Sequence, residues 1–332
     1  QAPVAVIDSD VTISDVDNTT ISGVGMIGGI NGSVDGGEEV YAIGGQQFAI
    51  GSPKLIVVTQ GGTDFELDFD GNSLQIQVNA GTGAIADMES LLATMTYQHT
   101  GDVPTAGLRT FSFIVTDADG GNSNVVVSSI NVVAVNDSPT LSGIDGVVLN
   151  YSEGDGAVLL DQSVNALVSD VDSSDFAGGD LNIECDSGLQ AGEDIFAIRN
   201  QGTGAGQIGV SASDVTFGGV VIGTSSGGTG LTPLNIVFNS NATATAVSAL
   251  LQNITYENTI NANPTEGVRS LTVDFNDGDG GSIVTQNMTV NVSAVNDDPY
   301  NAGSLPTAVT VAEDVSSFVD LSSFNLADVD AG

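Results

Sequence analysis

The sequence predicts an all-β protein made of tandem two-layer β-sandwich modules, each with one short helix. Two observations predict this class: blocks of sequence recur 160 residues apart, and apolar residues alternate with polar ones inside the blocks. Alternation with a period of two is typical of strands with one buried face. The 332 residues suit two domains of ordinary size, and 41% hydrophobic residues are enough to form their cores.

The repeat is visible in several blocks that keep their order. Three of them recur with an offset of 160 residues: 104–109 as 264–269, 117–121 as 277–281, and 134–139 as 294–299. An acidic block near the start of each module occurs three times, at 14–17, 169–172 and 327–330. We therefore expect module 1 at residues 1–137, module 2 at 138–297 and the opening segment of a third module at 298–332.

The alternation is clearest in residues 64–70, where acidic side chains alternate with large apolar ones. A Gly-Asn turn at 71–72 and a second alternating run at 74–78 complete a predicted hairpin. The last strand of module 2 is expected within 284–295, again with one apolar face. These patterns predict sandwiches in which each sheet has one face in contact with solvent.

One segment in each module has helical spacing instead. Apolar residues within 85–95 and within 247–254 recur three and four positions apart. This predicts a short helix that packs its apolar stripe inward over an open end of the sandwich. The glycine-rich stretch 218–230 is expected to be a loop.

The charge is strongly unbalanced, with 42 acidic residues against four Lys and Arg and a formal net charge of −38. Nucleic acids and anionic membranes require basic patches, so both are excluded as partners. Cys185 is the single cysteine, which excludes an intrachain disulfide. No stretch approaches about 18 uninterrupted apolar residues, so membrane insertion is not expected. Residues 1–10 lack the pattern of a signal peptide, and a secretion signal is expected outside this sequence.

Acidic residues gather at three positions of the repeat. These are an Asp-x-Asp pair near the module start, an Asp-x-Asp-Gly-Gly loop late in the module, and an Asn-Asp at the module junction, followed two positions later by a proline that stiffens the linker. In chain order they are Asp15, Asp17, Asp117, Asp119, Asn136, Asp137, Asp170, Asp172, Asp277, Asp279, Asn296, Asp297, Asp328 and Asp330.

Such clusters supply the ligands that Ca²⁺ prefers, namely about six to eight hard oxygens from carboxylates, amides and backbone carbonyls. We therefore predict calcium at the Asp-x-Asp pairs and the junctions. The alternative is that these residues only form Asx turns. For the late loops, a simple hairpin turn is an equal alternative.

The junctions, Val-Asn-Asp-Ser-Pro at 135–139 and Val-Asn-Asp-Asp-Pro at 295–299, resemble a shortened form of the Asp-x-Asn-Asp-x-x-Pro linker of cadherins. The whole chain is similar to the cadherin-like repeats of giant bacterial surface proteins and adhesins, although it lacks the internal Asp-Arg-Glu motif of animal cadherins. The resemblance implies cadherin- or immunoglobulin-like sandwiches with calcium at each module boundary. The linker Asn-Asp, an early Glu of the preceding module and the Asp-x-Asp pair of the following module would share the ion.

Carried over by position, the resemblance implies two ligand sets. The first junction would use Asn136 and Asp137 with Asp170 and Asp172, and the second would use Glu153, Asn296 and Asp297 with Asp328 and Asp330. Glu313 is the next early Glu, 160 residues after Glu153. The counterpart of both would precede Gln1, so we interpret the sequence as a window on a longer array.

No set of residues predicts catalysis. His99 is expected in a loop, and its counterpart in module 2 is Asn258, so no His–Ser–Asp or His–Cys pairing recurs. Cys185 is expected to be a small buried apolar residue. The acidic face of 64–70 has no counterpart in module 2 and is expected to be a solvated strand face.

We therefore expect a non-enzymatic, extracellular array at the cell surface, a stalk or filament that calcium stiffens, with neighbouring modules of the same chain as partners. Two alternatives are left open. One is a module that binds a polysaccharide or another cell-surface ligand. The other is a filament of identical chains joined head to tail, in which residues 301–332 donate to the next subunit the opening segment that module 1 lacks.

Overall fold

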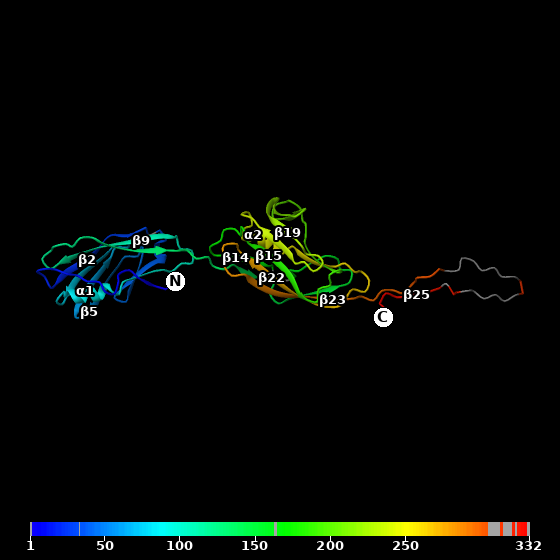
Figure 1. Cartoon of the computed structure of the whole chain (residues 1–332), viewed down its shortest axis with the longest axis horizontal. Helices are drawn as coiled ribbons and strands as arrows, with labels where there is room; N and C mark the ends of the chain where they lie inside the picture. Colours follow the sequence, from blue (N-terminus) through cyan, green and yellow to red (C-terminus); the bar gives the residue numbers. More distant parts are fainter. Residues whose placement is uncertain are drawn as a thin grey trace. The chain divides into compact units, whose positions relative to one another are not determined.

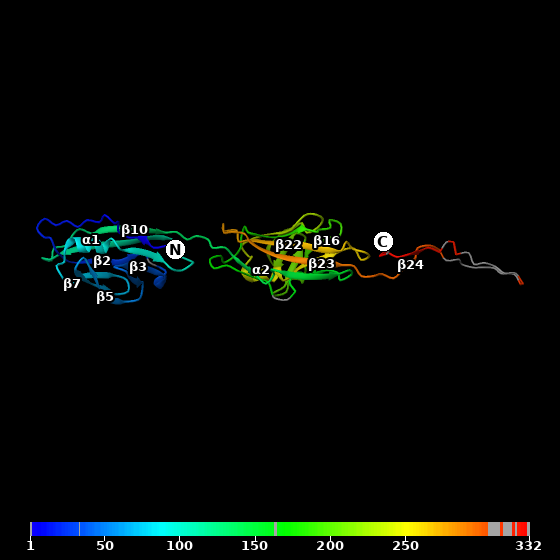
Figure 2. The ribbon, with the colours of Figure 1, turned by 90° about the horizontal axis from the view of Figure 1, so that it is seen from below.

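A computed structural model describes residues 2–32, 34–162, 165–304, 313–314, 321–322 and 324–330, with the side chains of 27–30 excepted. They form two compact units, unit 1 at 1–135 and unit 2 at 136–332. Within these residues each unit is a β-sandwich with one α-helix (Figures 1 and 2). The all-β prediction is confirmed, as is one short helix per module.

Unit 1 has ten strands among its described residues, a 3₁₀ turn (Gly36–Glu38) and α1 (Ile85–Leu92). The strands are β1 (Val4–Ala5), β2 (Ile21–Asn31), β3 (Glu39–Ile43), β4 (Gln46–Ala49), β5 (Lys54–Gln60), β6 (Thr63–Phe69), β7 (Leu74–Ala80), β8 (Thr96–His99), β9 (Gly107–Asp117) and β10 (Val126–Val132). One sheet has the order β1-β8-β3-β4, and the facing sheet has the order β10-β9-β2-β7-β6-β5.

The core of unit 1 lies between these two sheets. On β6 the predicted alternation holds, because Phe65, Leu67 and Phe69 are buried while the acidic residues between them face outward. Phe69 packs edge-on against Tyr41 of the other sheet, with ring centroids 5.2 Å apart. An edge-on aromatic pair contributes stability beyond that of the apolar area it buries, so this contact stabilises the packing of the two sheets.

Unit 2 contains the remaining strands and α2 (Ala244–Leu251). The strands are β11 (Thr140–Ser142), β12 (Val147–Ser152), β13 (Val158–Leu159), β14 (Leu167–Ser169), β15 (Asp180–Ser187), β16 (Asp194–Ile198), β17 (Ile208–Ser211), β18 (Asp214–Phe217), β19 (Val220–Ser226), β20 (Leu234–Phe238), β21 (Ile254–Asn258), β22 (Gly267–Asn276), β23 (Val284–Ser293), β24 (Tyr300–Asn301) and β25 (Leu326–Ala327). The large sheet has the order β12-β23-β22-β15-β20-β19-β18-β17, and β13-β21-β16 faces it. Two short pairs, β11-β14 and β24-β25, complete the unit.

Two predicted elements of unit 2 fall as expected and one does not. On β23, Met288, Val290 and Val292 are buried in turn, and α2 buries its apolar stripe beside β14 (Figure 1). The prediction of a loop over 218–230 is wrong, because this stretch contains β19. Gly223 lies inside that strand, where a Cβ atom would stand 2.4 Å from the carbonyl oxygen of Val237. Glycine is used here for close approach of two strands.

The first and last long strands of unit 2 lie next to each other. β12 pairs with β23 in parallel, so that Leu149 lies opposite Val290 and Tyr151 opposite Val292. Leu149 and Tyr151 are 2% and 0% exposed, so β12 closes this side of the core. The Tyr151 hydroxyl donates to the carbonyl oxygen of Asn258, 3.1 Å away, which connects the two sheets.

A buried arginine ties one loop of each unit to the sandwich. In unit 2, Nε of Arg269 donates to Oδ2 of Asp194 at 2.8 Å, and both residues are almost fully buried. The same guanidinium donates to the carbonyl oxygen of Thr265. Glu193 completes the anchor, because its carboxylate accepts from the backbone and hydroxyl of Thr265 and from Asn258. The loop at 264–269 is therefore held by a fully hydrogen-bonded ion pair.

Unit 1 repeats this arrangement with other residue types. Arg109 donates from Nε to Oε1 of Glu39 at 2.7 Å, and Thr105 donates twice to Asp35. His99 takes the place of Asn258: it ends β8, is 1% exposed and bonds to Asp35 at 3.1 Å. The prediction of His99 in a loop is wrong, and its contacts are those of a structural residue.

These carboxylates predict an acid-sensitive anchor. Burial raises the pKa of Glu193, but the hydrogen bonds from Thr265 and Asn258 and the charge of Arg269 outweigh it, and the pKa lies below its ordinary value of 4.5. A lowered folded pKa contributes stability that is present above about pH 4.5 and is lost as the pH falls through the folded pKa. We expect Glu193→Gln to lower the melting temperature by several degrees at pH 7 and to approach the wild type below pH 4. Thermal unfolding from pH 7 to pH 3 measures this, with the exposed Glu184→Gln as control. If the difference in melting temperature between Glu193→Gln and the wild type does not narrow as the pH falls, the prediction is wrong.

Candidate functional site

The Asn-Asp of the first junction lies against both acidic loops of unit 2. The backbone N–H of Asp137 donates to Oδ2 of Asp172 at 3.0 Å. Nδ2 of Asn136 donates to Oδ2 of Asp277 at 2.8 Å. A further contact, from the N–H of Ser282 to the hydroxyl of Ser138, holds the next linker residue beside the late loop. The three acidic positions of the repeat therefore meet at one end of the unit. We call this group the first acidic site; it consists of Asn136, Asp137, Asp170, Asp172, Asp277 and Asp279.

Each acidic pair in this site forms a tight turn around its first aspartate. Oδ1 of Asp170 accepts from the backbone N–H groups of Asp172 and Ser173, and Oδ1 of Asp277 accepts from the N–H of Asp279. The Asx turns that we considered as the alternative are thus present. The turn at Asp170 uses only Oδ1, so Oδ2 of the same carboxylate takes no part in it.

Two oxygens of the first acidic site have no hydrogen-bond partner although they are buried. These are Oδ2 of Asp170 and Oδ1 of Asp172. A buried polar atom without a partner is costly, and more so when it carries charge. Burial raises the pKa of Asp170, and the neighbouring charge of Asp172 adds to this effect against the backbone hydrogen bonds that lower it. The site therefore favours a bound cation or a proton.

A second acidic site repeats this geometry at the next junction. The backbone N–H of Asp297 donates to Oδ2 of Asp330, and Oδ1 of Asp328 accepts from the N–H of Asp330. Nδ2 of Asn296 donates to the carbonyl oxygen of Asp297, as Asn136 does to Asp137. Oδ2 of Asp297 and Oδ1 of Asp330 are again buried without a partner.

Glu153 belongs to this second site. Its Oε2 accepts from the N–H of Val295 and its Oε1 from the N–H of Asn263. Burial raises the pKa of Asp297, and the charges of Glu153, Asp330, Asp328 and Asp298 raise it further. The residues that the resemblance assigned to the second junction therefore lie together. Glu313 lies on an exposed turn, and the residues on either side of 313–314 fall outside the described part of the chain.

Unit 1 has the same two acidic loops. Oδ1 of Asp15 accepts from the N–H groups of Asp17 and Asn18, and Asn18 in turn donates to Asp119 at 3.2 Å. Oδ1 of Asp117 accepts from the N–H of Asp119. Asp15 and Asp17 are exposed, whereas Asp170 and Asp172 are half-buried. In unit 2, Asn136 and Asp137 lie against the corresponding pair of loops.

The donor set fits a hard cation. It consists of carboxylate, amide and backbone oxygens, with neither histidine nor cysteine, which suits Ca²⁺ and not Zn²⁺. The buried oxygens without partners at Asp170, Asp172, Asp297 and Asp330 are atoms that an ion could satisfy. Across the described residues, however, no three His, Cys, Asp or Glu side chains are already close enough together to hold a metal ion. Calcium therefore stays a prediction.

Sequence reasoning missed two contributions to these sites. It assigned the late loop no place in the junction, whereas Asp277 is 1% exposed and bonds directly to Asn136. It also did not assign Phe176, whose N–H donates to the carbonyl oxygen of Ala242 and whose ring packs at 4.9 Å on Phe275. These contacts fix the segment that follows Asp172. Only the offset of 160 between the two late loops signalled that they have a shared role.

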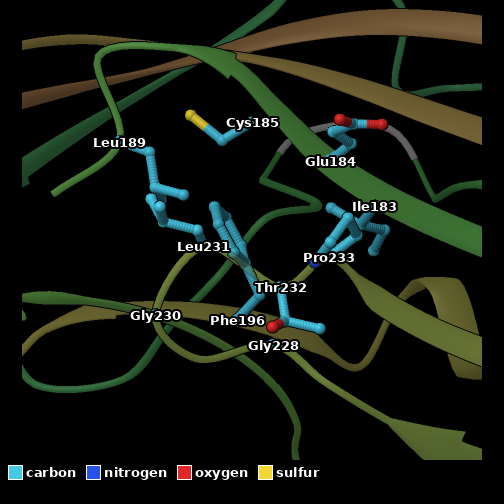
Figure 3. Close-up of a pocket in the computed structure, with 10 residues that line it drawn as sticks. All are labelled: Ile183, Glu184, Cys185, Leu189, Phe196, Gly228, Gly230, Leu231, Thr232 and Pro233. Carbon is cyan, nitrogen blue, oxygen red and sulfur yellow. The ribbon is translucent and has the colours of Figure 1, made fainter. Parts of the chain in front are cut away.

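Cys185 lies beside a small cavity rather than in the core. The cavity is lined by Leu189 and Phe196 and by the loop 228–233, and Figure 3 shows the Cys185 side chain at its edge. Its volume of about 30 Å³ admits about one water molecule and no organic substrate. Cys185 itself is half-buried, and burial raises the pKa of its thiol, so the thiolate is disfavoured. The expectation of a buried cysteine is corrected to a half-buried one.

The aromatic residues offer little for a sugar ligand. Tyr41, Tyr97, Tyr151 and Tyr256 are all buried in the cores. Among the described tyrosines only Tyr300 is exposed. Within the part of the chain that the structure describes, no helix is long and apolar enough to cross a membrane.

No family model and no curated protein matches the chain. Among solved structures it is similar to the C-terminal domain of the AgI/II polypeptide BspA of Streptococcus agalactiae, with 11% identity and a TM-score of 0.24 over 82% of this chain and 84% of that chain. A protocadherin gammaB7 EC3-6 structure shows 11% identity and a TM-score of 0.27, over 85% of this chain and 62% of that chain. The titin domains Z1Z2 in complex with telethonin show 9% identity and a TM-score of 0.24, over 83% of this chain and 99% of that chain. Similarities this distant assign no function.

Proposed function

We propose that this chain is an extracellular structural or adhesive array, acting as a stalk or filament, in which calcium bound at each module boundary fixes the linker to the following module. One observation carries the proposal. Asn136 and Asp137 are held against Asp172 and Asp277, and the oxygens left over at Asp170 and Asp172 are buried without partners. So much negative charge close to a linker is unfavourable unless a counter-charge is bound.

The ligands at the first acidic site would be Asp137, Asp170, Asp172 and Asp277, with Asn136 and Asp279 beside them. At the second site they would be Glu153, Asp297, Asp328 and Asp330. When bound, Ca²⁺ supplies two positive charges that satisfy the unpartnered oxygens and offset the repulsion among the carboxylates. This chain's own residues supply the rest: the linker's N–H and amide groups hold the carboxylates in place before any ion arrives.

The array would then respond to its surroundings. Extracellular calcium modules bind with a Kd of about 0.1–1 mM, so such sites are filled outside cells and empty in cytosol. Without the ion, the like charges would favour release of the linker from the loops. With the ion, each linker becomes a fixed part of the unit that follows it. This behaviour suits a protein that must be stiff only after secretion.

Calcium titration of the full chain tests the proposal. At about 100 times Kd a ligand stabilises the folded state by about 2.7 kcal/mol, which raises the melting temperature by about 5–10 °C for a unit of this size. We expect CaCl₂ to produce this rise and MgCl₂ at equal concentration to produce less, since Mg²⁺ gives up its water reluctantly. Small-angle scattering should show a stiffer particle with calcium than with chelator.

The variant Asp172→Asn locates the effect. We expect it to remove one class of calcium sites in isothermal titration while its melting temperature in chelator is unchanged or higher, since it removes a like charge. The matched control is Asp214→Asn, an exposed aspartate at the start of β18 in the same unit. Calcium binding that is absent in the wild type, or unchanged in Asp172→Asn, would mean that these loops are only turns.

A further inference from the structure

The strand β5 is an open edge of unit 1. It ends the sheet β10-β9-β2-β7-β6-β5 and, among the described residues, pairs with β6 alone (Figure 2). β5 lies in the middle of the sequence of the unit, and the segments on either side of it are described, so its open edge is a property of unit 1 itself. A strand edge with unpaired N–H and C=O groups is a template for a further strand.

Unit 2 covers the matching edge with a strand of its own. There β17, β18, β19 and β20 precede α2 as β4, β5, β6 and β7 precede α1 in unit 1. However, β17 pairs with β18 and ends the large sheet, whereas β4 pairs with β3 of the other sheet. Ile208 of β17 and Val215 of β18 are both 0% exposed. In β5, Ile56 and Val58 pack on the core but are only half-buried. The inner face of β5 therefore lacks the cover that β17 gives to β18.

The outer face of the same edge combines apolar and acidic side chains. Leu55 and Val57 of β5 are 63% and 45% exposed. The register places Leu55 opposite Asp68 and Val57 opposite Glu66 of β6. Residues directly opposite each other on paired strands share a face of the sheet, so exposed apolar residues at the edge lie beside a row of carboxylates. Within the described part of the chain, neither Glu66 nor Asp68 has a hydrogen-bond or ion-pair partner.

No basic residue of unit 1 neutralises these carboxylates. The ammonium group of Lys54 donates to Gln46 and to the carbonyl oxygen of Gln47, and it lies 5.1 Å from the centroid of the Phe48 ring, so it is held by β4. Arg109 is buried against Glu39. The charge that complements this edge must therefore come from a partner. A second copy of the chain would bring the same acids and a formal charge of −38, which disfavours pairing between two β5 strands.

We propose that β5 accepts an extended segment of a basic protein as an antiparallel strand in which apolar and basic residues alternate. The direction is that of β17 against β18. The apolar side chains of the segment cover Ile56 and Val58, and main-chain hydrogen bonds supply affinity. Its Lys or Arg side chains lay their methylene stems along the exposed apolar residues of β5 and place their charges near the carboxylates of β6. The added strand would lie about 10 Å from β6, a span that a long basic side chain and a carboxylate bridge together. This contact uses none of the residues of the two acidic sites.

Two synthetic peptides of equal composition and charge test the proposal. The probe is acetyl-Val-Lys-Val-Lys-Val-Lys-Val-amide, and the control peptide, acetyl-Val-Val-Val-Lys-Lys-Lys-Val-amide, lacks the alternation. When each is titrated into the full chain in about 0.15 M salt, where charges more than about 8 Å apart are screened, the probe should bind at least tenfold more tightly. Amide hydrogen exchange should show new protection in residues 54–60 with the probe and none in 46–49.

The variant Val57→Lys tests the edge itself. We expect it to weaken binding of the probe at least tenfold, because it places a positive charge where the basic side chains of the probe lie. The matched control is Val237→Lys, since Val237 of β20 in unit 2 is 48% exposed. Both replaced side chains are exposed, so neither variant should lower the melting temperature by more than a few degrees.

A double variant tests the charges. Glu66→Gln with Asp68→Asn should weaken binding of the probe at least fivefold. The matched control is Glu184→Gln with Asp186→Asn, which removes two exposed acids at the same spacing on β15 of unit 2.

Three outcomes would overturn the proposal. Equal affinity for the two peptides would show that the probe is attracted only by the net charge of the chain. Binding that leaves hydrogen exchange in 54–60 unchanged would show that no strand is added. If the wild-type chain alone sediments as a dimer that Val57→Lys dissociates, the strand that pairs with β5 comes from a second copy.

Discussion

Replacing Arg269 by methionine should destabilise unit 2 by about 3–5 kcal/mol, the range found when one partner of a buried ion pair is removed. Arg269 and Asp194 are 1% and 2% exposed, and their closest atoms are 2.8 Å apart. Methionine fills part of the space but leaves the Asp194 carboxylate buried without its counter-charge. It also removes the donor to the carbonyl oxygen of Thr265, so the loop that follows Pro264 loses its anchor.

Chemical denaturation of the full chain measures this loss. The matched control is Arg199→Met, since Arg199 is exposed and donates from Nε to Asn253; we expect a change of about 0.5 kcal/mol or less. Adding Asp194→Asn to Arg269→Met should recover part of the loss, because the stranded charge is then gone. A loss below about 1 kcal/mol for Arg269→Met would show that water reaches the pair and that the anchor is weak.

Replacing Phe275 by alanine should also cost about 3–5 kcal/mol, the usual effect of truncating a fully buried phenylalanine. Phe275 is 0% exposed and contacts Phe176 and Phe238, with ring centroids 4.9 and 6.0 Å apart. The variant leaves a cavity and also frees Phe176, which fixes the segment after Asp172. We therefore expect calcium binding at the first acidic site to weaken along with the fold.

Denaturant unfolding combined with amide hydrogen exchange separates these effects. Ile283→Ala is the control, because Ile283 lies just before β23 and is 58% exposed. Protection should fall first in residues 173–179 of the Phe275→Ala variant. If the variant unfolds at the same denaturant concentration as the control, neighbouring side chains must close the cavity, and the aromatic cluster does not support the site.

The alternating strands were predictable because only a period of two places every apolar residue of β6 or β23 on one face. The stretch 218–230 was not, since its glycines are read as turn residues. In β19, however, Gly223 lies in the strand interior because the carbonyl oxygen of Val237 leaves no room for a side chain. Glycine occurs both in turns and inside strands, and at Gly223 only the position of the neighbouring strand shows which of the two applies.

The acidic sites were predictable as sets of residues, because the repeat returns the same acids at the same offset. Their assembly was not: no pattern in the sequence says that Asn136 reaches Asp277. The buried arginine anchors were missed for a different reason. Arg109 pairs with Glu39 and lies near Asp35, whereas Arg269 pairs with Asp194 beside Glu193, so spacing and residue type both differ between the modules. The available signal was the recurrence of Arg109 as Arg269 in a chain with only four Lys and Arg.

The parallel pairing of β12 with β23 has a mechanical consequence. The chain enters unit 2 towards Val147 and leaves it after Ser293, so tension along the chain pulls these two strands in opposite directions along their length. All hydrogen bonds of the ladder from Val147–Met288 to Ser152–Ser293 are then loaded together in shear, rather than opened one at a time from an end. Unfolding under force is governed by the height of that barrier and not by equilibrium stability. The order of strands thus places this ladder in a shear geometry when tension is applied along the chain.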